Sequence, residues 1–407
     1  MTETLASTSR EAAAALDSAD PLAPFRDRFV IDDAVAYFDA NSLGRLPAGT
    51  PARLERVVRG EWGRELVRGW DHWLALPLEV GDRLAPLLGA STGEVALADS
   101  TTVNFYRLLV GALDARRERR AIVTDRPNFP TDRYVIEGLA AARGLEIRWL
   151  EPDPIEGPTF ADVAAVLDRD VAVVTLSHVN YRSAAIADLA SITAAAHDVG
   201  ALVVWDLSHA AGSIPVGLDE NDVDLAVGCT YKYLNGGPGA PAFLVVAARL
   251  QAELRQPIWG WFGQRDQFAM GRGYDPPPDI RRFLVGTPGI LGLAAADEGI
   301  RLSVEAGIDA IRAKGIALTE YAIALHDAWL APRGTTLGSP RDPSRRGSHV
   351  AIRHPQARGL TAAMIASGVI PDFREPDSIR IGLSPLTTSF EEAWRGLSVL
   401  RELLESG

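Results

Sequence analysis

Three short runs of aliphatic residues alternate with longer helical stretches in the middle of the chain, and this alternation limits the possible folds most. The runs are AIVTD at 121–125, VAVVTLSHV at 171–179 and ALVVWD at 201–206. Apolar strands separated by helices indicate right-handed crossovers and a buried, mostly parallel sheet. The predicted fold class is therefore α/β, with one large domain built around this sheet.

Polar side chains follow each of these runs at the point where the strand ends. They lie at 125–128, 177–180 and 206–209, and include Asp125, Ser177 and Asp206. Open parallel sheets bind their ligands at the carboxyl ends of the strands. We therefore expect the three clusters to line one crevice.

The pattern changes near residue 300. One long helix is expected over 300–331, followed by short strands at 348–354 and 378–385 and a terminal helix at 389–406. Helices packed on a few strands indicate a second, smaller α/β domain, whose boundary we place near the GTPGILGL turn at 286–293. The first 20 residues are rich in Ala and Ser, and the sequence leaves open whether they form a short helix or a frayed extension.

The composition excludes several classes of function. A formal charge of -12 argues against a nucleic-acid surface, which requires clustered Lys and Arg. The single cysteine, Cys229, allows neither an intramolecular disulfide nor a cysteine-based metal site, so we expect no metal. We find no secretory signal and no apolar run of the roughly 18 residues that cross a bilayer, and we predict a cytoplasmic protein with no membrane contact.

Asp206 and Lys232 are the first candidates for a chemical role. Asp206 ends a buried strand, where an unpaired carboxylate is costly, and Lys232 lies 26 positions later in the glycine-rich stretch TYKYLNGGPG. One interpretation is a buried ion pair. The other is that both address one aromatic cofactor, Lys232 through an imine to an aldehyde and Asp206 through a protonated ring nitrogen, as in pyridoxal phosphate (PLP) enzymes.

Two further segments favour the cofactor interpretation. The stretch DSTTVN at 99–104 precedes a helix and supplies either a phosphate site or a plain N-cap. Phe129 in NFPTD offers an aromatic face that suits a flat ring, although a core position is the alternative. His209, three residues after Asp206, is the weakest member because lone histidines are usually structural.

Together, nine stretches in one order resemble the kynureninases, within the class V aminotransferase branch of fold-type I PLP enzymes. They span most of the chain and are YFDANSLGRLP, DSTTVN, NFPTD, LSHVNYRS, WDLSHAAGSIPV, GCTYKYLNGGPG, GWFGQR, RRFLVGTP and DFREPDSIRIGLSPL. The resemblance implies an N-terminal segment at 1–50 that closes over the site, a large PLP-binding domain at 51–297 and a small domain at 298–407. It also implies a homodimer with shared active sites.

The resemblance also implies roles for individual residues. Lys232, Tyr231 and Asp206 would be catalytic, with Lys232 carrying the cofactor and moving the α-proton. The α-carboxylate of an amino-acid substrate would bind Arg380, whose planar guanidinium suits it, with Asn41 and Ser42 closing over the same site. His72 would bind the substrate near its aryl end. The residues implied in cofactor binding are Thr101, Thr102, Phe129, Asp132, Ser177, Asp206, His209, Tyr231, Lys232, Trp261 and Thr287.

The implied reaction is hydrolysis of the β,γ carbon–carbon bond of L-kynurenine, of 3-hydroxykynurenine or of a related aryl γ-keto amino acid, giving an anthranilate and L-alanine. The chain departs from the family at Gln264, at Thr387 and around 70–73. The sequence therefore leaves open which substituent the aryl ring of the substrate carries. Alternatives are a carbon–sulfur β-lyase, an aminotransferase and a binding protein without activity. A cysteine desulfurase is disfavoured because Cys229 lies three residues before the lysine.

Overall fold

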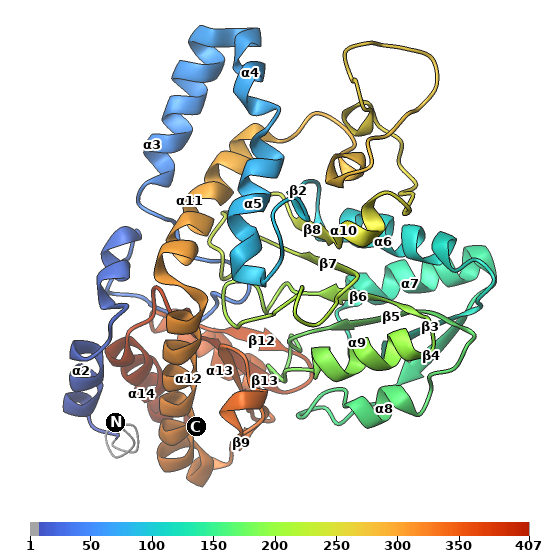
Figure 1. The fold of residues 1–407 in the computed structure, drawn as a ribbon. Coiled ribbons are helices and arrows are strands. Elements are labelled where there is room, and N and C mark those ends of the chain that lie inside the picture. Colours follow the sequence, from blue (N-terminus) through green and yellow to red (C-terminus); the bar gives the residue numbers. More distant parts are fainter. Residues whose placement is uncertain (1–7, 407) are drawn as a thin grey trace.

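One seven-stranded sheet forms the centre of the computed structural model, which describes residues 8–406 (Figure 1). The strand order is β2-β8-β7-β6-β5-β3-β4; the pairs from β7 to β4 are parallel, and β8 is antiparallel to both neighbours. The predicted α/β class with a mostly parallel sheet is confirmed. The strands are β2 (Val95–Leu97), β3 (Ala121–Asp125), β4 (Glu146–Leu150), β5 (Val171–Ser177), β6 (Leu202–Asp206), β7 (Leu225–Gly228) and β8 (Phe243–Val246).

Helices cover both faces of this sheet because its central strands are apolar on both sides. Val173 and Val204 pack with α6 and α7 on one face, whereas Val174 and Val203 pack with α5, α9 and α11 on the other. Among the described residues, no helix has both the length and the apolar character needed to cross a bilayer. The helices are α5 (Leu76–Leu88), α6 (Thr101–Ala115), α7 (Pro130–Arg143), α8 (Phe160–Ala164), α9 (Leu189–Asp198), α10 (Ala248–Gln251) and α11 (Ile290–Ala306).

A second, antiparallel sheet of four strands forms in the C-terminal part, in the order β12-β13-β10-β9. The apolar sides of three helices, α12, α13 and α14, share a core with it. These elements are α12 (Ile308–Leu325), β9 (Thr336–Leu337), β10 (His349–Arg353), α13 (Ala357–Ala366), β11 (Val369–Ile370), β12 (Asp372–Arg374), β13 (Ser378–Gly382) and α14 (Phe390–Ser406).

The N-terminal residues pack on this C-terminal part (Figure 1). Strand β1 (Ala36–Tyr37) pairs with β11 in parallel, and Ala13 and Leu16 of α2 (Arg10–Ser18) enter the core that contains α14. The open question about the first 20 residues is thus answered by a short helix within the described range, and residues 1–7 lie outside it. The division at residues 50 and 297 stays a prediction; position 297 falls inside α11.

The long helix expected over 300–331 is wrong. Helix α11 begins ten residues earlier, at Ile290, and ends at Ala306, and α12 then begins at Ile308. Gly307 separates them with φ 77° and ψ 138°, a conformation that glycine adopts without a Cβ penalty. The apolar period continues on both sides of this residue, which is why the sequence pattern conceals the break.

Candidate active site

The polar ends of β3, β5 and β6 meet beside one another. Ser177 Oγ donates to Asn128 Oδ1 at 2.8 Å and lies 3.5 Å from Asp206 Oδ2. Asp206 Oδ1 in turn accepts from the backbone N–H of Ser208 at 2.8 Å. The crevice that the strand ends predict is therefore present, and its floor is a hydrogen-bonded row.

A cavity of about 410 Å³ opens at this edge of the sheet. It takes side chains from the start of α6, from Phe129 and the first turn of α7, from the end of β6 and from the loop after β7. Eight residues predicted to hold a cofactor line it, namely Thr101, Thr102, Phe129, Asp132, Asp206, His209, Tyr231 and Lys232.

Lys232 is the amine of this cavity. Its Nζ lies 3.3 Å from His209 Nε2 and 5.8 Å from the centre of the Phe129 ring. The sequence contains one other lysine, Lys314, whose Nζ is buried and 2.6 Å from Asp20 Oδ2. Lys232 is thus the lysine that an aldehyde in the cavity would meet.

Asp132 lines the same cavity as Lys232 and Asp206. Asp132 is buried and its Oδ2 has no hydrogen-bond partner. Burial, followed by the neighbouring charges of Asp206 and Asp125, raises the pKa of Asp132 well above its usual value. This burial favours the neutral form of Asp132, and its unpartnered oxygen is free to meet a polar group of a bound molecule.

The start of α6 supplies a seat for an anion. Ser100 caps the helix, its Oγ accepting from Val103 N at 3.4 Å, so Thr101 and Thr102 keep their hydroxyls for a ligand. The first-turn N–H groups of a 15-residue helix attract negative charge. An amine, an acid, an exposed aromatic face and this helix start together fit the donor set that PLP requires.

Tyr231 and His209 keep defined protonation states. The adjacent Cys229, then burial, raise the pKa of Tyr231, so its phenol retains its proton and acts as a donor. Burial and the charge of Lys232 lower the pKa of His209 well below its usual value, so its ring is neutral. A neutral His209 ring adds no positive charge beside Lys232 Nζ.

Arg380 lies on β13 with its guanidinium 1% exposed and surrounded by acceptors. Asn41, with its amide oxygen toward the guanidinium, accepts from Nε at 2.9 Å and from Nη2 at 3.1 Å. Ser42 Oγ accepts from Nη2 at 3.0 Å. The N-terminal loop and the C-terminal sheet therefore meet at this arginine, as the resemblance implies.

Two glycines allow this close approach. A Cβ on Gly382 would lie 1.7 Å from the side-chain amide of Asn41, and a Cβ on Gly44 would lie 2.3 Å from the carbonyl oxygen of Lys232. Gly44 N also donates to Tyr231 O at 2.8 Å. The loop that carries Asn41 and Ser42 is thus pressed against both Arg380 and the lysine segment.

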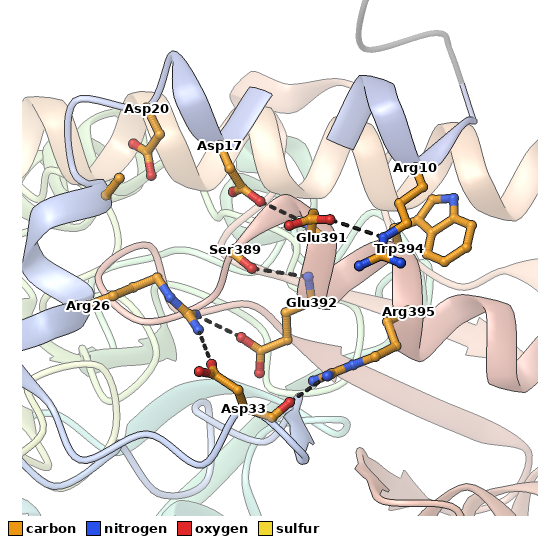
Figure 2. A pocket seen from close by; sticks show the side chains of 11 residues that line it. Arg10, Asp17, Asp20, Arg26, Asp33, Ser389, Glu391, Glu392, Trp394 and Arg395 are labelled. Carbon is orange, nitrogen blue, oxygen red and sulfur yellow. Dashed lines mark hydrogen bonds and ion pairs between the residues drawn. The ribbon is translucent and has the colours of Figure 1, made fainter. Parts of the chain in front are cut away.

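Glu392, at the start of α14, fixes both ends of this loop. Its Oε1 accepts from Tyr37 N at 2.8 Å and from Arg45 Nη2 at 2.7 Å, and its Oε2 accepts from Arg26 at 2.9 Å. Figure 2 shows Glu392 at the base of a charged pocket, with Arg26 bridging it to Asp33. The side chains of this pocket satisfy one another and hold the loop in place.

Comparisons with known proteins identify the family of this chain. The family model described as "Kynureninase C-terminal domain" matches residues 311–400. The kynureninase of Burkholderia pseudomallei strain 1106a is 44% identical over 405 residues, which cover 98% of this chain and 96% of that protein. The chain belongs to the kynureninase family. The kynureninase of Pseudomonas fluorescens is 42% identical over 406 residues, with the same coverage, and the resemblance drawn from the sequence is confirmed.

Solved structures confirm the fold of this kynureninase family member. A cysteine desulfurase from Thermococcus onnurineus superposes with a TM-score of 0.82 at 19% identity, covering 94% of this chain and 98% of that one. A C-DES mutant with glycine covalently linked to its PLP cofactor gives 0.82 at 18% identity, covering 93% and 99%. At these identities the likeness concerns the fold alone.

Some residues expected in the kynureninase site lie outside the Lys232 cavity within one chain. Ser177 contacts Asp206 but does not line the cavity, and Trp261 is 43% exposed at the start of a short 3-10 helix. Thr287 lines an adjoining cavity that shares Asp99 and Gly239. His72 is half-exposed, and its Nε2 is 3.4 Å from Glu61 Oε2. Their cofactor and substrate roles stay predictions.

Three residues near the site had no role in the sequence interpretation. His349 is fully buried, neither ring nitrogen has a hydrogen-bond partner, and its ring lies 5.9 Å from that of His209. Asp372 contacts Arg380, and Glu392 anchors the loop. A histidine inside the buried strand SHVAIR was the one available sequence signal; the other two contacts depend on long-range packing. Within residues 8–406, no three His, Cys, Asp or Glu side chains gather as metal ligands would.

Proposed function

We propose that the chain is a PLP-dependent hydrolase that cleaves the β,γ carbon–carbon bond of L-kynurenine, 3-hydroxykynurenine or a related aryl γ-keto amino acid. The observation that carries this proposal is that Lys232, Asp206 and the start of α6 line one cavity in a chain 44% identical to a kynureninase. The products are an anthranilate and L-alanine.

The cavity residues divide the work of holding the cofactor. Lys232 would bind the aldehyde, Asp206 would pair with the ring nitrogen, Phe129 would stack on the ring, and Thr101 with Thr102 would hold the phosphate. When bound, PLP supplies an electron sink for the substrate α-carbon. Asp132, whose Oδ2 has no hydrogen-bond partner, lies in the same cavity and would contact the same group.

The remaining steps belong to the protein and to water. Arg380 binds the α-carboxylate, and Lys232 takes the α-proton and returns it elsewhere on the substrate. Tyr231, which keeps its phenolic proton, donates near the γ-carbonyl. Water adds to that carbonyl, the β,γ bond breaks, the aryl half leaves as a carboxylic acid and the β-carbon gains a proton to become the methyl group of alanine.

The carbon–sulfur lyase and aminotransferase alternatives are not favoured. The solved desulfurases share the fold at 19% identity or less, whereas the kynureninases match almost the whole chain at 42–44%. The lone cysteine is buried beside the lysine rather than on an exposed loop.

A homodimer with shared sites is part of the proposal, as is a cytoplasmic location. The segment from α3 (Thr50–Glu55) to α4 (Trp70–Trp73) projects from the body of the fold (Figure 1). Large apolar side chains are exposed on it and on the loop before α11, namely Val58, Trp62, Leu66, Val67, Trp259, Trp261, Phe268 and Met270. Such surface typically marks an interface, and a partner there would bring its own Trp261, Thr287 and His72 toward the site.

The test is to incubate the enzyme in parallel with L-kynurenine, 3-hydroxy-L-kynurenine and an S-aryl cysteine conjugate. Alanine together with an anthranilate, in equal amounts, is the expected result. Pyruvate from the conjugate alone would replace the proposal with a β-lyase. The ratio of rates for the two kynurenines, measured again in His72→Phe and Gln264→Leu, tests whether either side chain contacts the ring substituent, since a hydrogen-bonding pocket discriminates a hydroxyl strongly.

A further inference from the structure

Asp372 and Arg380 are direct neighbours across two antiparallel strands. Asp372 of β12 pairs in register with Arg380 of β13, and Asp372 Oδ2 accepts from Arg380 Nη2. The arginine side chain is 1% exposed and the aspartate 14%. A carboxylate of the protein therefore occupies the arginine that the proposed function assigns to the carboxylate of the substrate.

The guanidinium has no free edge for a second carboxylate. An arginine offers five N–H donors, and bidentate binding needs two on one edge. Asn41 takes Nε and shares Nη2, while the carbonyl oxygen of Tyr181 accepts from Nη1 at 2.5 Å. Nη2 also serves Ser42 and Asp372. An incoming carboxylate thus displaces one of these groups.

Asp372 is the partner of Arg380 that a substrate would displace, because a second arginine lies beside it. Arg374 Nη2 lies 2.8 Å from Asp372 Oδ2, and the Arg374 side chain is 36% exposed. Asn41 is fully buried and Tyr181 contributes backbone, so neither moves as easily. Two carboxylates on one guanidinium repel each other, which adds to the preference for displacing Asp372.

The surroundings of Arg380 contain buried polar atoms that lack partners. Asp39 Oδ1, the Tyr233 hydroxyl and both ring nitrogens of His349 make no hydrogen bond. Burial is the largest influence on the pKa of each of these three residues, and the charge of Arg380 also acts to lower it. A polar ligand bound next to Arg380 could form hydrogen bonds with these atoms. A purely structural ion pair would not require unpartnered donors and acceptors around it.

We propose that Asp372 is an internal stand-in for the substrate α-carboxylate, and that its exchange between Arg380 and Arg374 sets the affinity for amino acids. This inference rests on the proposed function. It makes Asp372 a competitor, so removing its charge strengthens binding. Removing Arg374 leaves Arg380 as the one arginine, among the described residues, that contacts Asp372, and it weakens binding.

The experiment measures the dissociation constant of L-alanine, the proposed product, from the change it causes in the visible absorbance of the PLP-loaded enzyme. Asp372→Asn is expected to tighten L-alanine binding about tenfold and Arg374→Gln to weaken it by a similar factor, the scale of one hydrogen bond to a charged group. L-alaninamide, which lacks the carboxylate, is expected to bind all three proteins alike. Asp377→Asn, which removes the partner of Arg353 on the same sheet, is the matched control and should change nothing.

Weaker L-alanine binding in Asp372→Asn would overturn the inference and make Asp372 a residue that merely orients Arg380. Equal changes for L-alanine and L-alaninamide would overturn it as well. If Asp372→Asn fails to fold, the sign of the Arg374→Gln effect alone decides, since an orienting Asp372 predicts no loss there. A wild-type protein that binds PLP but turns over no kynurenine refutes the proposed function, whereas the alanine measurements still decide the role of Asp372.

Discussion

Lys232 Nζ lies 3.3 Å from a ring nitrogen of His209, and both side chains are buried at the carboxyl edge of the large sheet. Burial and the lysine charge hold His209 neutral, so the pair contains one cation at most. The other polar side chains that line the cavity around this amine carry carboxyl or hydroxyl groups. This arrangement favours covalent capture of an aldehyde by Lys232 over a structural ion pair.

Arg380→Ala tests the assignment of the carboxylate site. The variant is expected to lose roughly 2 to 5 kcal/mol of transition-state stabilisation, measured as kcat/KM for L-kynurenine, because the α-carboxylate loses its partner. The visible absorbance of bound PLP should remain, since Arg380 is outside the Lys232 cavity. Arg353→Ala on the neighbouring strand is the control; lost cofactor with intact amino-acid binding would show that the role is misassigned.

Glu392→Gln tests the anchoring of the N-terminal loop (Figure 2). Glu392 is 4% exposed and serves Tyr37 N, Arg45 and Arg26, so losing its charge should lower the free energy of unfolding by about 3 kcal/mol in a urea titration. Glu391→Gln, next to it, removes a surface pair with Arg10 and should cost less than about 1 kcal/mol. Equal losses in the two variants would mean that Glu392 is not an anchor.

His178 gives a pH-dependent contribution to stability. Burial lowers the pKa of His178 to about 4, so the unfolded chain binds a proton there as pH falls below about 6.5 and the folded protein does not. The contribution of His178 to the free energy of unfolding is thus present above pH 6.5 and is lost as pH falls toward 4. Between pH 7.5 and 5.5 the wild type should lose about 1.4 kcal/mol more than His178→Gln.

The pH dependence of the wild type must be compared with that of His178→Gln, because a second buried group titrates in the same range. Burial raises the pKa of Asp125 to about 7, and its proton uptake in the folded state changes stability in the opposite direction over the same range. Subtracting the variant from the wild type removes that contribution. An identical pH dependence in the wild type and in His178→Gln would contradict the assignment.

Mixing two inactive variants tests the shared sites of the proposed dimer. Lys232→Ala lacks the lysine, and a double variant Trp261→Ser with Thr287→Ala lacks the residues expected from the partner. After subunits exchange, half of the dimers are mixed and each has one intact site, so activity should return to about a quarter of the wild-type value. No recovery, despite mixed dimers seen by mass spectrometry, would place Trp261 and Thr287 in their own chain's site.

Much of the large domain follows from local sequence. The run AIVTD coincides with β3, and the polar residues after β3, β5 and β6 meet as parallel strands require. The break at Gly307 is hidden because the helical period of apolar residues continues on both sides of it.

The second half of the site depends on contacts between distant segments. Arg380 meets Asn41 across more than 300 positions, and Glu392 meets Tyr37 across 355. No spacing in the sequence encodes such pairs. Family resemblance supplied the first, whereas the second and the Asp372 contact appear only when the N-terminal loop is seen against the C-terminal sheet.

The most direct test of the account is to reduce the PLP-loaded protein with borohydride and map the pyridoxyl mass by peptide sequencing. With two lysines in the chain, the result is nearly binary. The account predicts the modification on Lys232, whose Nζ faces the cavity of Asp206 and Thr101. A pyridoxyl group on Lys314, or on neither lysine while the protein turns over kynurenine, would contradict it.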